Sequence, residues 1–407
     1  MRSPSVIVLS LCVVCSATTA FADEDGLLDC SSRSLADAVN DHRDGGRGPD
    51  HDRDNDRTIR FTGVCAGPIV IRTDRITLQG VNTAVIDGGG QSDAITVDGA
   101  SRVALAGFEV RNGVNGILGR NGAHFTVSAV NAHDNVVFGI SLQTSSSALL
   151  SDVTISHNGV HGLDLETGSA AEVSGSLTVE ANRVFGINAN GSSITFSQAT
   201  VSVTGNALGI QIATNGNAFI NDRETVLNVN NNLSSGLTVV SGAHMVSFGG
   251  TINASGNPVN GVSVNSKGGL DLDAASTLNS FNNGDGLVVQ QDSVMTVFNT
   301  PQFSGAPGFS TINAHDNTGN GVRIQSGSTV TLVNQARIIS IQNGRTGIVA
   351  DNGVGVTLVN STITGNTIQD IQLTFGTRAD LRTLVFGTYT CDATVLVRGT
   401  SPIVCPH

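Results

Sequence analysis

The sequence predicts an all-β solenoid, a single-stranded parallel β-helix in which one chain winds through successive coils of similar length. Three observations predict it. A glycine followed by a branched aliphatic residue recurs along the chain, an asparagine recurs in phase with it, and the segments between them alternate apolar and polar residues. No long helical period appears between the repeats, so we expect the coils to be built from short strands and turns.

The recurrent glycine marks one position in each coil. Successive glycines are 23 to 27 residues apart, with one spacing of 35, and in the last repeat Asp370 and Ile371 replace the glycine and the aliphatic residue. We expect that aliphatic residue to point inward, because a repeated apolar position is what stacked coils bury in a continuous core. The glycines are Gly116, Gly139, Gly162, Gly186, Gly209, Gly236, Gly261, Gly286, Gly321 and Gly347.

An asparagine stands four residues before ten of these eleven anchors, and in the remaining coil Gly205 takes its place with Asn206 following. Asparagine and glycine tolerate the left-handed backbone angles that a coil needs at its corner. Equivalent positions on neighbouring coils lie about 4.8 Å apart, so the side-chain amides are expected to hydrogen-bond along a ladder. The predicted ladder consists of Asn112, Asn135, Asn158, Asn182, Asn232, Asn257, Asn282, Asn317, Asn343 and Asn366.

The two ends of the chain differ from the coils. In residues 1–22, Arg2 precedes a short apolar run, and Ala20-Phe21-Ala22 provides a cleavage site, as in a secretory signal peptide. That run is too short to span a bilayer, and no other long apolar stretch follows it, so we expect a secreted or periplasmic protein. We expect an N-terminal cap over residues 23–57, the β-helix over 58–380 and a C-terminal cap over 381–407.

The N-terminal cap is predicted to contain one short helix and one charged loop. Ser34 to Asp37 resembles a capping box that opens a helix within residues 30–42, and this helix would cover the open edge of the first coil. The segment that begins at Asp50 resembles the start of a calcium loop, but Asn55 and Phe61 stand where glycine and glutamate are needed. We therefore expect a solvated loop and no cofactor, with bound calcium as the alternative.

Four cysteines remain after the signal peptide, two near each end of the chain. In an exported protein they are expected to form the disulfides Cys30–Cys65 and Cys391–Cys405. An end-to-end pairing is disfavoured because the two ends of a long stack lie far apart, and four free thiols are the remaining alternative. Each disulfide is expected to contribute roughly 2–4 kcal/mol.

The coil pattern N-x-x-x-G-[I/V/L] resembles the repeat of the right-handed parallel β-helix proteins of the pectin-lyase-like superfamily. The resemblance covers about residues 58–372. It implies the right-handed winding, which also agrees with the strong preference of parallel crossover connections. Activity on a polysaccharide is implied only by analogy with the superfamily's lyases, hydrolases and epimerases, and fold analogy is a weak guide to function.

One candidate catalytic site lies next to the asparagine ladder. Arg111, Asp134 and His157 stand five residues before successive anchors and are expected on adjacent coils. In the catalytic hypothesis, Asp134 orients His157 as a general base and Arg111 neutralises a substrate carboxylate. In the structural hypothesis they are a surface charge ladder. The five residues Asn131 to Asn135 recur as Asn313 to Asn317, which favours the structural hypothesis.

A second candidate set, for substrate binding, follows the anchors. Asp164 and Glu166 are expected to face outward on the third coil, with Arg120 in the register of Glu166. His157 and His161 have an H-x-x-x-H spacing but lie on a turn without an adjacent glutamate, so we expect no metal site.

These observations favour an exported non-catalytic protein that binds a ligand or forms part of a surface or envelope, with a polysaccharide or envelope glycan as its partner. The net charge of −12 argues against nucleic acid, because phosphate binding needs lysine and arginine. The alternative is a lyase, epimerase or hydrolase that acts on an acidic glycan. The chain has no tryptophan and one tyrosine, Tyr389, which is unusual for a site that stacks sugar rings on aromatic residues.

Overall fold

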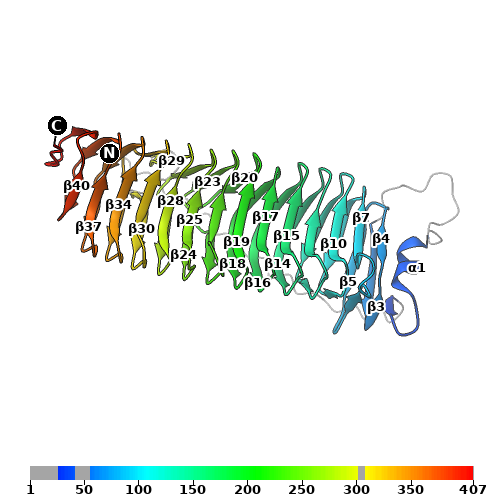
Figure 1. The fold of residues 1–407 in the computed structure, drawn as a ribbon. Helices are drawn as coiled ribbons and strands as arrows, with labels where there is room; N and C mark the ends of the chain where they lie inside the picture. The colour runs from blue at the N-terminus through cyan, green and yellow to red at the C-terminus, as the bar shows by residue number, and fades with distance from the viewer. Residues whose placement is uncertain (1–25, 42–55, 301–307, 407) are drawn as a thin grey trace, which may run out of the picture.

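The chain forms one long solenoid in the computed structural model, which describes residues 26–41, 56–300 and 308–406. Figure 1 shows the coils stacked along one axis from the N-terminal to the C-terminal end. All strand pairings between neighbouring coils are parallel, with regular registers such as Ile117↔Ile140 and Ile140↔Leu163. The predicted parallel β-helix is therefore confirmed. The predicted signal peptide and the segment Asp50 to Asn55 of the charged loop lie outside the described residues.

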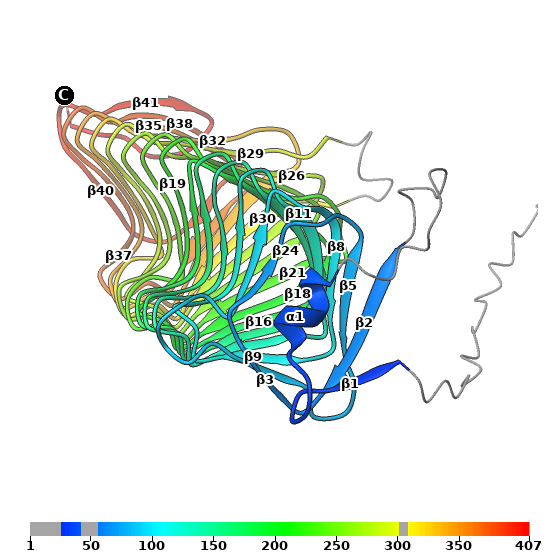
Figure 2. The same ribbon diagram turned by 90° about the vertical axis from the view of Figure 1, so that its right-hand side faces the viewer.

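Each coil contributes strands to three sides of the solenoid, which Figure 2 shows end-on. Side one is a 14-stranded sheet. Its strands are β4 (Ile69–Ile71), β7 (Ile95–Asp98), β10 (Asn115–Arg120), β13 (Phe138–Leu142), β15 (His161–Glu166), β17 (Phe185–Asn190), β19 (Leu208–Ala213), β22 (Leu237–Val239), β25 (Asn260–Val264), β28 (Asp285–Val289), β31 (Val322–Gln325), β34 (Thr346–Asp351), β37 (Gln369–Leu373) and β40 (Tyr389–Cys391).

Sides two and three are joined into a 27-stranded sheet because three strands run through the corner between them, namely β14 (Ser147–Ser156), β16 (Ala170–Glu180) and β18 (Ser193–Thr204). The other strands of side two are β1 (Leu27–Asp29), β2 (Arg57–Thr62), β5 (Ile76–Gly80), β8 (Ser101–Ala106), β11 (His124–Ser128), β20 (Asn217–Ile220), β23 (His244–Phe248), β26 (Gly269–Asp273), β29 (Val294–Val297), β32 (Thr329–Leu332), β35 (Gly355–Val359), β38 (Arg378–Arg382) and β41 (Leu396–Gly399). The other strands of side three are β3 (Val64–Ala66), β6 (Val85–Asp87), β9 (Glu109–Arg111), β12 (Asn131–His133), β21 (Val226–Asn230), β24 (Thr251–Ser255), β27 (Thr277–Phe281), β30 (Ser310–His315), β33 (Ala336–Ile341), β36 (Thr362–Thr364) and β39 (Val385–Phe386).

The core is a continuous column of aliphatic side chains between the three sides. The aliphatic residue after every anchor lies in it, at an exposed fraction of 1% or less. These residues are Ile117, Ile140, Leu163, Ile187, Ile210, Leu237, Val262, Leu287, Val322, Ile348 and Ile371. The inward direction predicted for this position is therefore confirmed, and it follows from the alternation of side chains along each strand.

The asparagine ladder runs inside the corner between sides three and one. From Asn135 onward, each side-chain amide donates to the side-chain oxygen of the next coil over 2.9–3.3 Å. The ladder ends where Asn366 donates to Asp370 over 2.9 Å. The members are Asn135, Asn158, Asn182, Asn206, Asn232, Asn257, Asn283, Asn317, Asn343 and Asn366.

Two predicted ladder members were wrong, and one real member was not predicted. Asn112 and Asn282 occupy the left-handed residue of the corner, at φ +53° and +56°, and Asn206 and Asn283 take the ladder positions in their coils. The ladder residue directly follows the left-handed residue, whereas its distance from the anchor glycine varies. In the coils of Gly116, Gly209 and Gly286 the corner is one residue shorter, so counting back from the glycine misplaced it.

The N-terminal end is covered by α1 (Leu35–Asn40), the helix expected within residues 30–42. Ser34 caps it by accepting a hydrogen bond from the Asp37 amide over 3.1 Å. Leu35, Ala38 and Val39 are buried against the first coils, and Figure 2 shows α1 lying over the open end of the solenoid. The helix therefore covers apolar core that the missing next coil would otherwise expose. Among the described residues no helix is long and apolar enough to cross a membrane.

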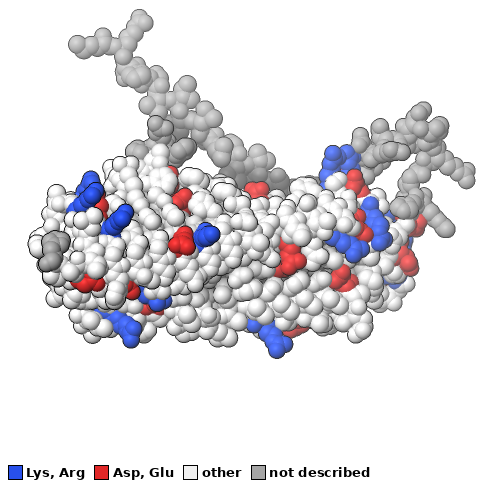
Figure 3. Space-filling view, turned by 45° about the horizontal axis from the view of Figure 1, so that its top comes forward, with Lys and Arg blue, Asp and Glu red and all other residues white. Residues whose placement is uncertain are grey.

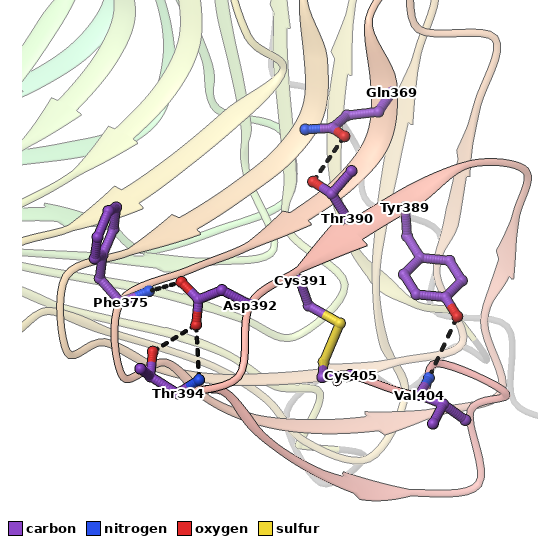
Figure 4. Close-up of a disulfide and its surroundings, with 9 residues drawn as sticks. All are labelled: Gln369, Phe375, Tyr389, Thr390, Cys391, Asp392, Thr394, Val404 and Cys405. Atoms are coloured by element: carbon purple, nitrogen blue, oxygen red, sulfur yellow. Dashed lines mark hydrogen bonds between the residues drawn. A yellow bond between two sulfur atoms is a disulfide. The ribbon is translucent and has the colours of Figure 1, made fainter. Parts of the chain in front are cut away.

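Both expected disulfides are present, Cys30–Cys65 and Cys391–Cys405. Figure 4 shows the second one tying β40 to the terminal segment. The coils extend beyond residue 380, where the sequence placed their end, because β39, β40 and β41 still pair in parallel with the coil before them. The residues after 380 therefore form a further coil that the disulfide closes.

Candidate functional site

Arg111 belongs to a charged cluster on side three rather than to a site with His157. Its guanidinium contacts the Asp87 carboxylate over 3.3 Å and the Glu109 carboxylate over 3.0 Å. The same Glu109 oxygen lies 3.0 Å from Nε2 of His133, whose Nδ1 lies 2.7 Å from Oδ2 of Asp134. Arg111 is thus held by two carboxylates of its own surface, which leaves its charge largely neutralised.

The register separates the three predicted catalytic residues. β9 pairs with β12 so that Arg111 faces His133, one position before Asp134. The physical reason is the shorter corner of the first coil, which places Asn112 in the column of Asp134 and His157. Asp134 and His157 do share this left-handed column, at φ +53° and +55°. However, Asp134 binds His133, and within the described residues no side-chain partner of the exposed His157 is found.

The contact between His133 and Asp134 occurs a second time. His315 and Asp316 have the same Nδ1–Oδ2 distance of 2.7 Å far along the stack. There His315 also stacks on Phe281 of the preceding coil, with ring centroids 5.1 Å apart and nearly parallel planes. The two histidine–aspartate pairs therefore have the same local geometry in different surroundings.

The predicted substrate-binding residues all lie on side one, in two separate columns. Arg120 is in the column of Glu166, with the coil of Gln143 between them. The Arg120 guanidinium pairs with Asp98 on the other neighbouring coil over 3.1 Å, and Arg72 reaches the same carboxylate over 3.3 Å. Arg120 is therefore drawn away from Glu166.

Asp164 lies in the other column and is completely buried, although it points away from the aliphatic core. Its Oδ1 accepts a hydrogen bond from Asn188 over 2.9 Å, and Asn188 in turn accepts one from Gln211 over 3.4 Å. Its Oδ2 has no hydrogen-bond partner. Burial raises the pKa of Asp164 to about 7, and the nearby charge of Glu166 acts in the same direction. The Asp164 carboxyl group is thus protonated in part at neutral pH.

An aromatic stack that the sequence analysis did not assign to a site lies beside Asp164. The His161 ring lies between Phe138 and Phe185, at centroid distances of 5.2 and 4.7 Å. Its Nδ1 accepts a hydrogen bond from the Phe185 amide over 3.2 Å, so Nε2 carries the proton and lies 4.0 Å from Oδ1 of Asp164. Burial lowers the pKa of His161 to about 4. The only sequence signal is a large side chain directly before successive anchor glycines.

Across the described part of the chain, no group of three histidine, cysteine, aspartate or glutamate side chains is arranged to hold a metal ion. Figure 3 shows that charged side chains on the face drawn there lie mostly toward the two ends of the solenoid, with a largely uncharged middle. The charged contacts described above, from Asp87 to Asp134, belong to the N-terminal third.

Three solved structures similar to this chain are reported, each with low sequence identity. The A-module of mannuronan C-5 epimerase AlgE6 from Azotobacter vinelandii is 16% identical, with 93% of this chain and 97% of that chain covered and a TM-score of 0.42. The exopolygalacturonase of Thermotoga maritima is 10% identical, with 84% of each chain covered and a TM-score of 0.26. PfbA, a surface adhesin of Streptococcus pneumoniae, is 8% identical, with 92% and 91% covered and a TM-score of 0.22.

No curated protein sequence matches the chain. Residues 69–283 match the family described as the right handed beta helix region, and this segment is more than half of the chain. The match agrees with the parallel coils and supports the right-handed winding that the repeat implied. The chain belongs to the right-handed β-helix family.

Proposed function

We propose that the protein is exported and binds a glycan without catalysing a reaction on it. The observation that carries this proposal is the repeated histidine–aspartate pair. His133–Asp134 and His315–Asp316 have the same 2.7 Å contact on coils far apart, so the pair is best explained as a property of the repeat. A catalytic dyad is needed once, next to a substrate site, whereas a structural pair recurs wherever the coil recurs.

The proposed binding surface is an outward column of asparagines on side three. Asn253 donates to Asn228, Asn279 to Asn253 and Asn313 to Asn279, over 2.8, 2.8 and 2.7 Å. They point outward because their strand neighbours, such as Leu227, Val229 and Leu278, are buried in the core. Each amide uses only part of its hydrogen-bonding capacity in the column. The remaining donors and acceptors recur about every 4.8 Å, which suits a polymer with repeating hydroxyl groups.

Export is supported by the residues Ala20-Phe21-Ala22 and by the two disulfides, since disulfides persist mainly in oxidising compartments. The polysaccharides to be tested are alginate, pectate, glycosaminoglycans and a neutral glucan, each with residues 23–407 of the chain. We expect calorimetric binding to at least one of them and no release of unsaturated uronate or new reducing ends.

Two variants sharpen this test. The double variant Asn253→Ala/Asn279→Ala should weaken binding about tenfold through loss of two hydrogen-bonding groups. The matched control, Asn217→Ala, removes an exposed asparagine from side two and should leave binding unchanged. Product release that disappears in His157→Ala would reject the non-catalytic proposal.

A polysaccharide-active enzyme is the second candidate, and Asp164 is the observation that favours it. A carboxyl group with a pKa of about 7 is a suitable general acid at neutral pH. Its complete burial argues against direct contact with a sugar. Turnover that is lost in Asp164→Asn and retained in His157→Ala would support this candidate.

A further inference from the structure

A hollow of about 540 Å³ lies on side two near the C-terminal end. It is formed by β32, β35, β38 and β41, which Figure 2 shows one behind another along the same side. Gly355 stands between Thr329 and Arg378 in one column of this surface. Because Gly355 has no side chain, its position opens the hollow that residues on the neighbouring strands enclose.

Two arginines at this hollow have no opposite charge to bind. Arg378 and Arg398 line it on neighbouring coils, with Arg398 directly opposite Asp380. The Asp380 carboxylate is already engaged by Arg382, which donates to its two oxygens over 2.9 and 2.6 Å. Within the described residues no side-chain partner of Arg378 or Arg398 is found. The hollow is therefore a locally positive site on a chain whose net charge is −12.

The geometry points to an anion-binding subsite, and we propose that this hollow binds a carboxylate- or sulfate-bearing sugar unit. A guanidinium group donates two parallel hydrogen bonds to a carboxylate or sulfate, and two such groups on one surface reinforce each other. The hydroxyl groups of Thr329 and Thr357 provide further polar contacts at its edge. The identification of the ligand as a sugar rests on the proposed glycan-binding function, whereas the anion selectivity rests on the arginines alone.

The test measures binding of trigalacturonate, a sulfated heparin disaccharide and neutral maltotriose to residues 23–407 by calorimetry. We expect one or both anionic probes to bind and maltotriose not to bind at this site. Because the arginines are exposed, the affinity should fall as sodium chloride is raised from 50 to 300 mM, on the order of the change that screening predicts. Whether the carboxylated or the sulfated probe binds more tightly identifies the source of the anion.

Three variants test the residues. Arg378→Ala/Arg398→Ala should reduce affinity for the anionic probe by at least about tenfold. Gly355→Thr should reduce it as well by filling the hollow without changing the charge, since a side chain at this position meets only Thr329 at 3.5 Å. Asp380→Asn should increase it, because Arg382 is then released from its carboxylate.

The matched control is Arg183→Ala/Arg345→Ala, which removes two exposed arginines elsewhere and changes the net charge equally. Equal loss of binding in the control and in Arg378→Ala/Arg398→Ala would overturn the subsite, because general electrostatics would then suffice. Anion binding that is unaffected by all three site variants would overturn it too. Binding of the free anions acetate or sulfate with no glycan binding would retain the anion subsite and reject the proposed glycan function.

Discussion

The side-chain amide of Asn158 lies directly against the backbone of Gly139 on the preceding coil. A Cβ atom at Gly139 would be 2.8 Å from Nδ2 of Asn158 and 2.3 Å from Cγ2 of Ile155. The same contact recurs at other anchors, for example between Gly162 and Asn182. The glycine and the asparagine of the repeat are therefore two halves of one packing arrangement, in which the glycine leaves room for the ladder.

Gly139→Ala is expected to destabilise the middle coils. The new methyl group displaces the Asn158 amide and Ile155, and overpacking of this kind typically costs about 1–3 kcal/mol. Thermal unfolding followed by circular dichroism should show a lower midpoint than for Gly26→Ala, the control, because no atom lies within 4 Å of a Cβ at Gly26. An unchanged midpoint would mean that the coils separate more easily than the close contact implies.

Asn282 and Asn283 should respond very differently to substitution. Asn283 is buried and its amide donates to Asn317 and to the Ala254 carbonyl, over 3.1 and 2.9 Å. Asn283→Leu leaves these groups unpaired and should cost about 2–3 kcal/mol. Asn282 has a left-handed backbone, so Asn282→Gly should be nearly neutral. Denaturant titration of both variants checks this, and equal losses would contradict the observed ladder.

Asp164→Asn should stabilise the protein at neutral and alkaline pH. The pKa of Asp164 is raised from its ordinary 3.8 to about 7, so between these values the unfolded chain releases a proton that the folded chain keeps. Stability is therefore lost as the pH rises from 4 to 7 and stays level above that. Asparagine keeps the acceptor for Asn188 and has no charge to bury, so the gain of the variant should grow across this window.

His161 acts in the opposite direction over the same range. Its pKa is lowered to about 4, so the unfolded chain binds a proton below 6.5 that the folded chain does not, and stability falls as the pH falls from 6.5 to 4. The measurement is therefore the difference in unfolding midpoint between Asp164→Asn and the parent protein at each pH, which cancels the effect of His161. A difference that does not vary between pH 4 and 7 would show that Asp164 is ionised in the folded state.

Removal of the Cys391–Cys405 disulfide should open only the C-terminal coil. The double variant Cys391→Ser/Cys405→Ser releases a loop with a sequence separation of 14 residues, which corresponds to about 3 kcal/mol. In a solenoid each coil contacts mainly its neighbours, so the loss stays local. Hydrogen exchange should become faster in β40 and β41, while protection of β15 and β17 is retained. Equal loss of protection in all coils would indicate that the whole solenoid unfolds as one unit.

The sequence by itself determined the architecture, because a solenoid writes its structure into one repeat. Coil length, the inward aliphatic residues and the asparagine column all follow from interactions between equivalent positions of neighbouring coils, and the pairing of the cysteines followed from their place at the two ends. The role of the anchor glycine was assigned wrongly at first. Its φ is not left-handed, and its function is close approach to the next asparagine.

Only the tertiary structure decided which residues share a column and which charges are already paired. A corner that is one residue shorter moves Arg111 into the column of His133, and it moves the ladder from Asn282 to Asn283. Side chains alternate between the core and the solvent, so a shift of one residue changes both the direction and the neighbours of every group that follows. For the same reason the unpaired Arg378 and Arg398 became visible only when Arg382 was seen to bind Asp380.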